Sequence, residues 1–201
     1  MAGGSSFEPH WWLNWEVVVV QPSLERRSIL TGAATLGIGD LLLPGRVSAQ
    51  AAAPQGYVLP AAGGEHLIHF RDSGDIFIKV DPVMGSENFA MGTQQLPAGG
   101  GIPIHRHLKM DEAFYVLEGS GTFVLDDMRY PIEKGAAIFI PKNAWHGFAN
   151  PDRELLLLWI MAPTGLDGFF RETCSPPGAP SKQVTRELRD EIARKYATEF
   201  R

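Results

Sequence analysis

Three histidines and one glutamate could bind a single metal ion if the fold brings them together. His105 and His107 are two positions apart, so in a β-strand both imidazoles project from the same face. Glu112 follows five positions later, where the next strand can present it beside them, and His146 stands at the opening of a further strand. Imidazole and carboxylate groups bind divalent metals, so the sequence predicts a metal site at His105, His107, Glu112 and His146.

The residues around this set predict an apolar interior that could serve as a substrate pocket. Phe114 and Val116 alternate with outward positions in the same strand as Glu112, so they share the face of its carboxylate. By the same parity argument, the predicted substrate-binding residues are Phe114, Val116, Phe148, Trp159 and Met161. Such a lining suits a planar aromatic or phenolic molecule, although ordinary core packing explains these residues equally well.

Short strands must position these residues, because runs rich in β-branched and aromatic residues alternate with turn residues from His66 onward. Such runs span Ile76–Val80, Asn88–Leu96, Ala113–Leu117, Gly121–Leu125, Ala136–Ile140 and Leu155–Met161. Strands at this spacing without intervening helices predict an all-β sandwich or barrel. Residues 65–164 are the expected barrel, preceded by an Ala-, Gly- and Pro-rich linker at residues 50–64.

The C-terminal part, residues 165–201, is predicted to be a connector followed by one helix. Residues 165–183 are rich in Gly and Pro, and Thr185 can cap a helix over about Arg186–Thr198. Phe169 and Phe170 could form a lid, but packing under this helix is the better interpretation. The pair His66 and His69 is given no role, since a spacing of three places the two on opposite strand faces.

Residues 1–49 are interpreted as a cleavable export signal of the twin-arginine type. Arg26 and Arg27 directly precede a short apolar run, Ile29–Gly39, and small residues allow cleavage after Ala49 or Ala51. Glu25 departs from the usual Ser or Thr, and an exposed basic pair before a short core helix is the alternative. The signal predicts a periplasmic or secreted protein.

Composition limits the classes of partner. The 201 residues carry 18 Lys and Arg against 23 Asp and Glu, a formal charge of −5, which argues against nucleic acid. No apolar run approaches the roughly 20 residues that span a bilayer, so no membrane association is expected of the mature form. One cysteine, Cys174, excludes an internal disulfide and a cysteine-based metal site.

Two motifs surround the four metal-binding candidates. Gly99, His105, His107, Glu112 and Gly119 occur at the spacing of the first cupin motif, and Gly135, Pro141, His146 and Asn150 at that of the second. Asn143 stands where glycine is common, and asparagine tolerates the left-handed backbone that glycine would supply. The sequence therefore resembles the cupin superfamily, and specifically the quercetin-dioxygenase-like cupins. The resemblance implies a small jelly-roll β-barrel, a metal held by the four side chains, and a homodimer.

Four protein ligands leave one or two positions open on a five- or six-coordinate ion, which permits catalysis. Iron or manganese is favoured if the protein takes its metal before export, while nickel, cobalt, copper and zinc accept the same ligands. The first hypothesis is a dioxygenase-like oxidoreductase for a phenolic or other metal-chelating substrate, with Glu112 as the catalytic proton acceptor. An O₂-independent lyase or isomerase and a non-catalytic small-ligand-binding cupin are the alternatives. No inward-facing arginine is expected, and Arg106 is expected to pair with Asp111 or a partner chain.

Overall fold

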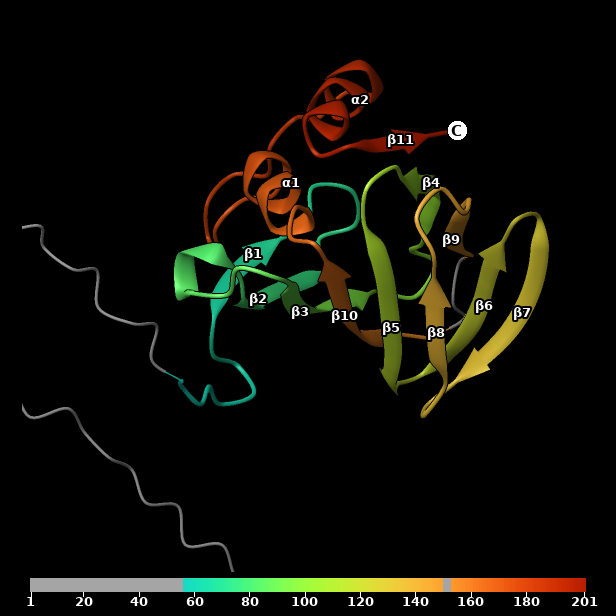
Figure 1. Cartoon of the computed structure of the whole chain (residues 1–201), viewed down its shortest axis with the longest axis horizontal. Coiled ribbons are helices and arrows are strands. Elements are labelled where there is room, and N and C mark those ends of the chain that lie inside the picture. Colours follow the sequence, from blue (N-terminus) through green and yellow to red (C-terminus); the bar gives the residue numbers. More distant parts are fainter. Residues whose placement is uncertain (1–55, 150–152) are drawn as a thin grey trace, which may run out of the picture. The chain divides into compact units, whose positions relative to one another are not determined.

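The computed structural model describes residues 56–149 and 153–201, and within them two antiparallel sheets face each other (Figure 1). The first sheet has six strands in the order β1 (Glu65–Ile68), β2 (Asp75–Val80), β3 (Ala90–Leu96), β10 (Leu155–Ala162), β5 (Asp111–Glu118) and β8 (Ala137–Ile140). The second has five strands in the order β11 (Thr198–Phe200), β4 (Ile102–His107), β9 (His146–Ala149), β6 (Ser120–Leu125) and β7 (Met128–Glu133). The predicted all-β jelly-roll barrel is confirmed.

Alternating burial along the strands forms the core between the two sheets. In β5, Glu112, Phe114 and Val116 are buried while the intervening positions are not, as the parity argument predicted. The inward residues of both sheets form one apolar cluster, which includes Ile76, Leu157 and Phe123. Burial of this apolar surface is the main favourable contribution to folding.

Turn residues adopt the backbone conformations that their types favour. Asp126 and Asp127 both have positive φ, 46° and 70°, and connect β6 to β7, whose strands pair up to Leu125 and Met128. Positive φ at both central residues is the requirement of a tight hairpin whose twist matches its strands. Asn143 has φ of 71°, so asparagine supplies the left-handed conformation predicted for it.

The C-terminal region departs from the prediction in two places. A helix α1 (Leu166–Thr173) lies in the segment read as a connector, where two glycines obscured the helical pattern. The predicted second helix, α2 (Arg186–Lys195), is present and Thr185 caps it by accepting a hydrogen bond from Leu188 N. It ends earlier than expected because Ala197, with φ of 49°, turns the chain into strand β11.

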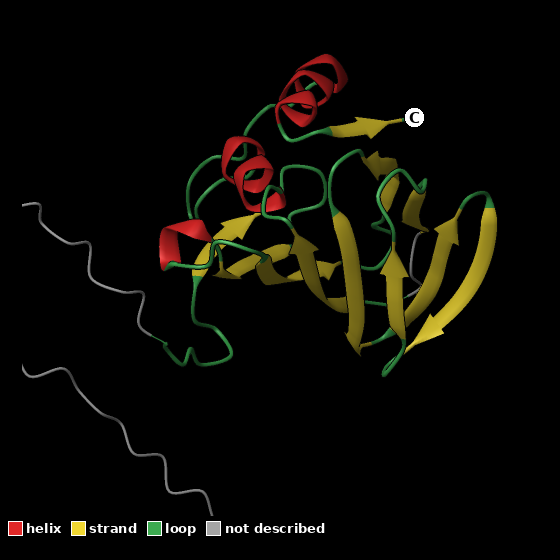
Figure 2. Cartoon of the chain, viewed as in Figure 1, coloured by secondary structure: helices red, strands yellow, loops and turns green. Residues whose placement is uncertain are grey.

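Both helices lie together on one side of the strands (Figure 2). Phe169 and Phe170 of α1 are buried and belong to the apolar core. In α2, Ile192 and Ala193 are buried, while Leu188 is exposed. None of the helices in the described part of the chain is long and apolar enough to cross a bilayer. The predicted export signal and residues 50–55 of the predicted linker lie outside the described residues and stay predictions.

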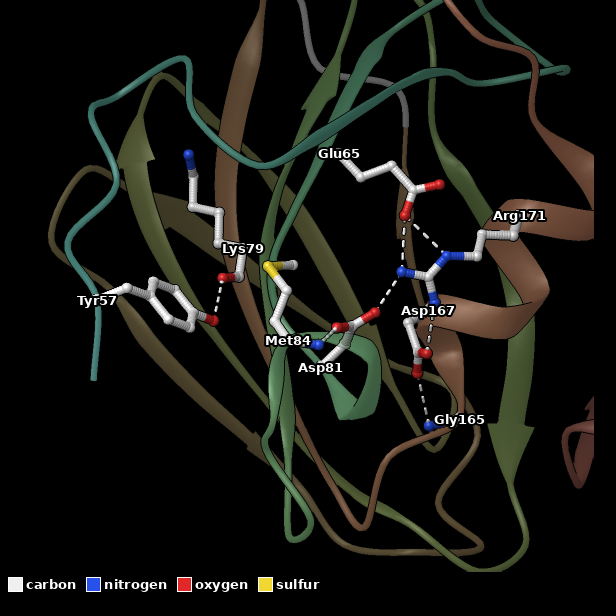
Figure 3. A network of polar contacts seen from close by, with 8 residues as sticks. All are labelled: Tyr57, Glu65, Lys79, Asp81, Met84, Gly165, Asp167 and Arg171. Carbon is white, nitrogen blue, oxygen red and sulfur yellow. Dashed lines mark hydrogen bonds and ion pairs between the residues drawn. The ribbon is translucent and has the colours of Figure 1, made fainter. Parts of the chain in front are cut away.

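Arg171 attaches α1 to the first sheet through a network of carboxylates (Figure 3). Its guanidinium donates to Glu65 of β1, to Asp167 one helical turn earlier, and to Asp81. The Asp81 side chain is fully buried and also accepts a hydrogen bond from Met84 N in the short 3₁₀ helix Pro82–Met84. Arg171 therefore neutralises a buried carboxylate and fixes the helix that carries Phe169 and Phe170.

We expect Arg171→Gln to lower the free energy of unfolding by about 2–3 kcal/mol, because Asp81 would remain buried without its cation. The loss is smaller than for a fully buried pair because 28% of the Arg171 side chain is exposed. Urea denaturation measures it. Arg129→Gln is the matched control, since Arg129 is exposed on β7 and forms no ion pair with any described residue. Equal midpoints for the two variants would contradict this role of Arg171.

Candidate metal centre

The two sheets together bring the four predicted ligands to one point. His105 and His107 lie on β4, His146 lies opposite His105 on the neighbouring strand β9, and Glu112 comes from β5 of the other sheet. All four residues are buried, and each offers a ligand atom within 4.8 Å of the others. The turn before β9 is tied to β4, because Asn143 N donates to His107 O at 2.7 Å.

Hydrogen bonds at the far ring nitrogen orient each imidazole. His105 Nδ1 lies 2.9 Å from Pro103 O, and His146 Nδ1 lies 3.0 Å from Ala144 O. A carbonyl oxygen can only accept, so both Nδ1 atoms carry the proton and both Nε2 atoms present a lone pair. This arrangement is the usual outer shell of metal-binding histidines.

His107 is oriented by a residue from the C-terminal strand. Its Nδ1 lies 2.8 Å from Thr198 Oγ1, and that hydroxyl donates its own proton to Tyr196 O at 3.2 Å. The hydroxyl has only one proton, so it accepts from His107 Nδ1–H and leaves His107 Nε2 unprotonated. Thr198 lies opposite His107 in the β11–β4 register, which places this hydrogen bond next to the ligand strand.

The donor set fits a divalent metal. His107 Nε2 is buried and forms no hydrogen bond with any described residue, although it lies 3.3 Å from Glu112 Oε2. A buried nitrogen without a partner is costly, and a metal ion bound at its lone pair would satisfy it. Glu112 Oε2 also lies 3.0 Å from His146 Nε2, so the carboxylate faces two of the imidazoles at once.

Electrostatics favour the metal-binding protonation states. Burial, with the charges of His146 and His107, lowers the pKa of His105 well below its usual value, so this imidazole is neutral. Burial by itself raises the pKa of the Glu112 carboxyl, but the neighbouring His107 and His146 outweigh it and lower that pKa below its usual value. A carboxylate with neutral imidazole is the form that binds metal.

A cavity of about 200 Å³ opens onto the cluster and is lined by His105, His107 and Glu112. Phenylalanine is the commonest residue type in its walls, and part of the lining comes from α1, from the start of α2 and from β11. The aromatic lining residues are Phe70, Phe114, Phe169, Phe170 and Phe200. Phe169 and Phe170 therefore border the cavity as well as packing in the core.

The predicted pocket residues divide into two groups. Phe114 lines the cavity beside Glu112. The other four do not line it, because their side chains fill the space between the sheets. These four are Val116, Phe148, Trp159 and Met161, all buried. Their role is to support the cavity wall: Phe148, for example, packs edge-on against Phe114 with ring centroids 5.0 Å apart.

Arginines near the cavity differ from the prediction. Arg71, Arg186 and Arg189 line it, although no inward arginine was expected. Arg71 comes from the β1–β2 turn and the other two from the first turns of α2, and neither segment was read as part of the site. Arg106 was expected to pair with Asp111 or with a partner chain, and in the structure it pairs with Glu199 of β11 at 2.6 Å and stacks over Trp145. Asp111 instead accepts a hydrogen bond from Lys142 N.

Sequence reasoning also missed Thr198, His69 and Gln94. Thr198 was placed at the end of a helix, so nothing in the pattern indicated a strand partner for His107. His69 was judged by its spacing from His66, yet it lies in the β1–β2 turn, where strand parity does not apply. His66 itself pairs with Asp75 at the surface, whereas His69 and Gln94 are buried and line the cavity.

Comparison with known proteins identifies the family of this chain. The cupin domain model matches residues 92–161, which contain the metal-ligand cluster. The chain is 32% identical over 95 residues to protein SchB of Streptomyces halstedii, covering 46% of this chain and 69% of SchB. The chain belongs to the cupin family.

Other relatives match shorter segments. An uncharacterised protein of Methanocaldococcus jannaschii is 34% identical over 55 residues, which is 27% of this chain, and the chain spans 44% of that protein's length. Among solved structures, an RmlC-like cupin from Shewanella frigidimarina shares 15% identity with a TM-score of 0.48, covering 57% of this chain and 97% of that one.

We expect Thr198→Val to weaken divalent metal binding about 10- to 100-fold, the usual effect of removing a partner that orients a metal ligand. Valine keeps the shape but cannot accept the His107 Nδ1 proton, whereas Thr198→Ser retains the hydroxyl. Competition with a chromophoric chelator measures the metal Kd, and His107→Ala gives the reference for loss of the ligand itself. Equal affinity of the valine and serine variants would show that the hydroxyl does not orient His107.

Proposed function

We propose that this protein is a metal-dependent oxidoreductase of the dioxygenase type that acts on a small metal-chelating phenol. The observation that carries the proposal is the convergence of three imidazoles and one carboxylate at an aromatic cavity. Four protein ligands leave coordination positions for a substrate. The bound metal, for which we propose iron or manganese, would supply Lewis-acid and one-electron redox chemistry for reaction with O₂.

The chain's own residues would bind and deprotonate the substrate. No described residue donates a hydrogen bond to Glu112 Oε1, so this oxygen can accept the phenolic proton while Oε2 faces His107 and His146. Phe114, Phe170 and Phe200 would hold a planar ring and exclude water. Sites for drug-sized ligands measure about 300–1,000 Å³, so a cavity of about 200 Å³ favours a single-ring substrate.

The charges at the cavity support a second candidate, an O₂-independent lyase or isomerase for an anionic substrate. Arg71 is paired with Asp72 at 2.8 Å, and Arg189 with Asp190 at 2.7 Å. Arg186 lies 4.0 Å from Asp190, so apart from Glu112 of the metal-ligand cluster, three guanidinium groups face two carboxylates and leave one positive charge in excess. An excess cation stabilises a bound anion.

We also propose that the protein forms a homodimer through the outer face of β5, β8 and β10. Six apolar residues gather on this face: Ala113, Tyr115, Ala137, Phe139, Leu158 and Ile160. Phe139 is 65% exposed and lies on β8, at the edge of the sheet. An apolar face beside an unpaired strand edge is typical of a protein–protein interface.

We expect the iron- or manganese-loaded protein to consume O₂ with catechols, and to do so faster than with larger flavonols. An oxygen electrode measures the uptake, with metal-stripped wild type and metal-treated His105→Ala as controls. Product formation under anaerobic conditions would favour the lyase or isomerase instead. Absence of O₂ uptake with every metal and substrate tested would rule out the dioxygenase proposal.

We expect light scattering to report a dimer for the wild type and a monomer for Phe139→Lys, because the new charge would be buried in the interface. Met128→Lys is the control, since Met128 is 62% exposed on β7, away from this face. A monomeric wild type at micromolar concentration would overturn the proposed dimer.

A further inference from the structure

Two buried polar side chains line the cavity without belonging to the metal-ligand cluster. His69, in the turn between β1 and β2, is 2% exposed, and Gln94, on β3, is 4% exposed. Both border the same cavity as His105, His107 and Glu112, but neither is part of the group of ligand atoms within 4.8 Å of one another. Their polar groups therefore need another explanation.

The contacts of His69 assign its proton to one nitrogen. Arg71 N donates to His69 Nδ1 at 3.1 Å, so in the neutral ring the proton sits on Nε2. Burial, together with the charge of Arg71, lowers the pKa of His69 well below its usual value, which keeps the ring neutral. No described residue accepts a hydrogen bond from Nε2–H.

The His69 ring is also held in place. Its backbone bonds both ways across the turn, from His69 N to Gly74 O and from Ser73 N to His69 O, each at 2.9 Å. The ring stacks on Phe70, with centroids 4.6 Å apart, and meets Phe170 edge-on at 6.3 Å. A fixed imidazole with one unused donor is arranged to bind an acceptor in the cavity.

Gln94 occupies an inward position that apolar residues take elsewhere on its strand. Ala90, Gly92 and Leu96 are the other inward residues of β3, and Gln94 lies between Ile76 of β2 and Leu157 of β10. Within residues 56–149 and 153–201, nothing hydrogen-bonds to its side-chain amide. The amide atoms are not among the fully enclosed polar atoms of the described residues, so they face the open space of the cavity, where a bound ligand can pair with them.

We propose that His69 and Gln94 form a second polar subsite that binds an acceptor oxygen of the substrate while the metal binds its chelating pair. The inference rests on the proposed function and narrows its substrate class. That class is a single-ring molecule with two adjacent metal-chelating oxygens and a further carbonyl or carboxylate oxygen. The His69 Nε2–H and the Gln94 amide donate to this oxygen, and the aromatic walls contact the ring.

Two catechols of similar size test the subsite. Protocatechualdehyde carries a formyl oxygen, whereas the corresponding methylcatechol carries a methyl group in its place. Calorimetry with the manganese-loaded protein under anaerobic conditions gives Kd for each and the ratio of the two. Comparing this ratio between variants cancels the difference in intrinsic chelation by the two catechols.

We expect Gln94→Met and His69→Phe each to reduce the preference for the aldehyde about tenfold, the effect of losing one hydrogen bond to the ligand. Gln94→Glu replaces a donor by an acceptor and should reduce the preference further. Gln95→Met is the matched control, because the adjacent Gln95 faces away from the cavity and accepts from Asp75 N at 3.2 Å. Its preference should equal that of the wild type.

Metal content and urea midpoints establish that each variant is folded and loaded, and Gln94→Met carries the test if His69→Phe does not fold. An unchanged preference in the Gln94 variants would overturn the subsite and leave the proposed function standing. A preserved subsite effect without any turnover would instead overturn the proposed function alone. Failure of both catechols to bind the manganese-loaded wild type would overturn both.

Discussion

Burial of four polar side chains at one point is the constraint on which this structure depends. A carboxylate and three imidazoles inside a barrel lose their hydration, and hydrogen bonds to residues outside this set satisfy only the outer nitrogens of the rings. The inner nitrogens and the carboxylate face one another within 4.8 Å. A divalent cation would satisfy all of them together, which is why this arrangement is better explained as a metal centre than as a structural network.

The same constraint joins the two sheets. Glu112 belongs to the six-stranded sheet and the three histidines to the five-stranded one, so the ligands converge only when the sheets pack correctly. The core residues behind them therefore matter to the site without touching a ligand. Trp159 shows this, since its indole packs so closely over Gly92 that a Cβ there would overlap it. Metal binding and packing of the barrel are thus coupled.

What could be predicted from the sequence was local in character. A spacing of two places His105 and His107 on the same face of β4, and the same spacing places Glu112 and Phe114 on the same face of β5. Both results hold whatever lies further along the chain. The cavity wall is not local. Parity identified Trp159 and Met161 as inward-facing, which they are, but could not tell the filled end of the barrel from the open one. That distinction depends on where α1 packs. The sequence did not predict α1, because it lies in a segment rich in glycine and proline.

The cavity is built partly by the segment that matches the cupin domain and partly by the C-terminal segment that follows it. The cupin domain match ends at residue 161, whereas nine of the nineteen residues that line the cavity come from residues 166–200. Family membership therefore accounts for the ligand set, while α1, α2 and β11 determine what reaches it. Thr198 belongs to this C-terminal segment and yet orients His107, so the part that shapes the cavity also helps to build the metal centre. Changes in the C-terminal segment can thus alter the shape of the cavity and the orientation of a metal ligand together, although the segment lies outside the cupin domain match.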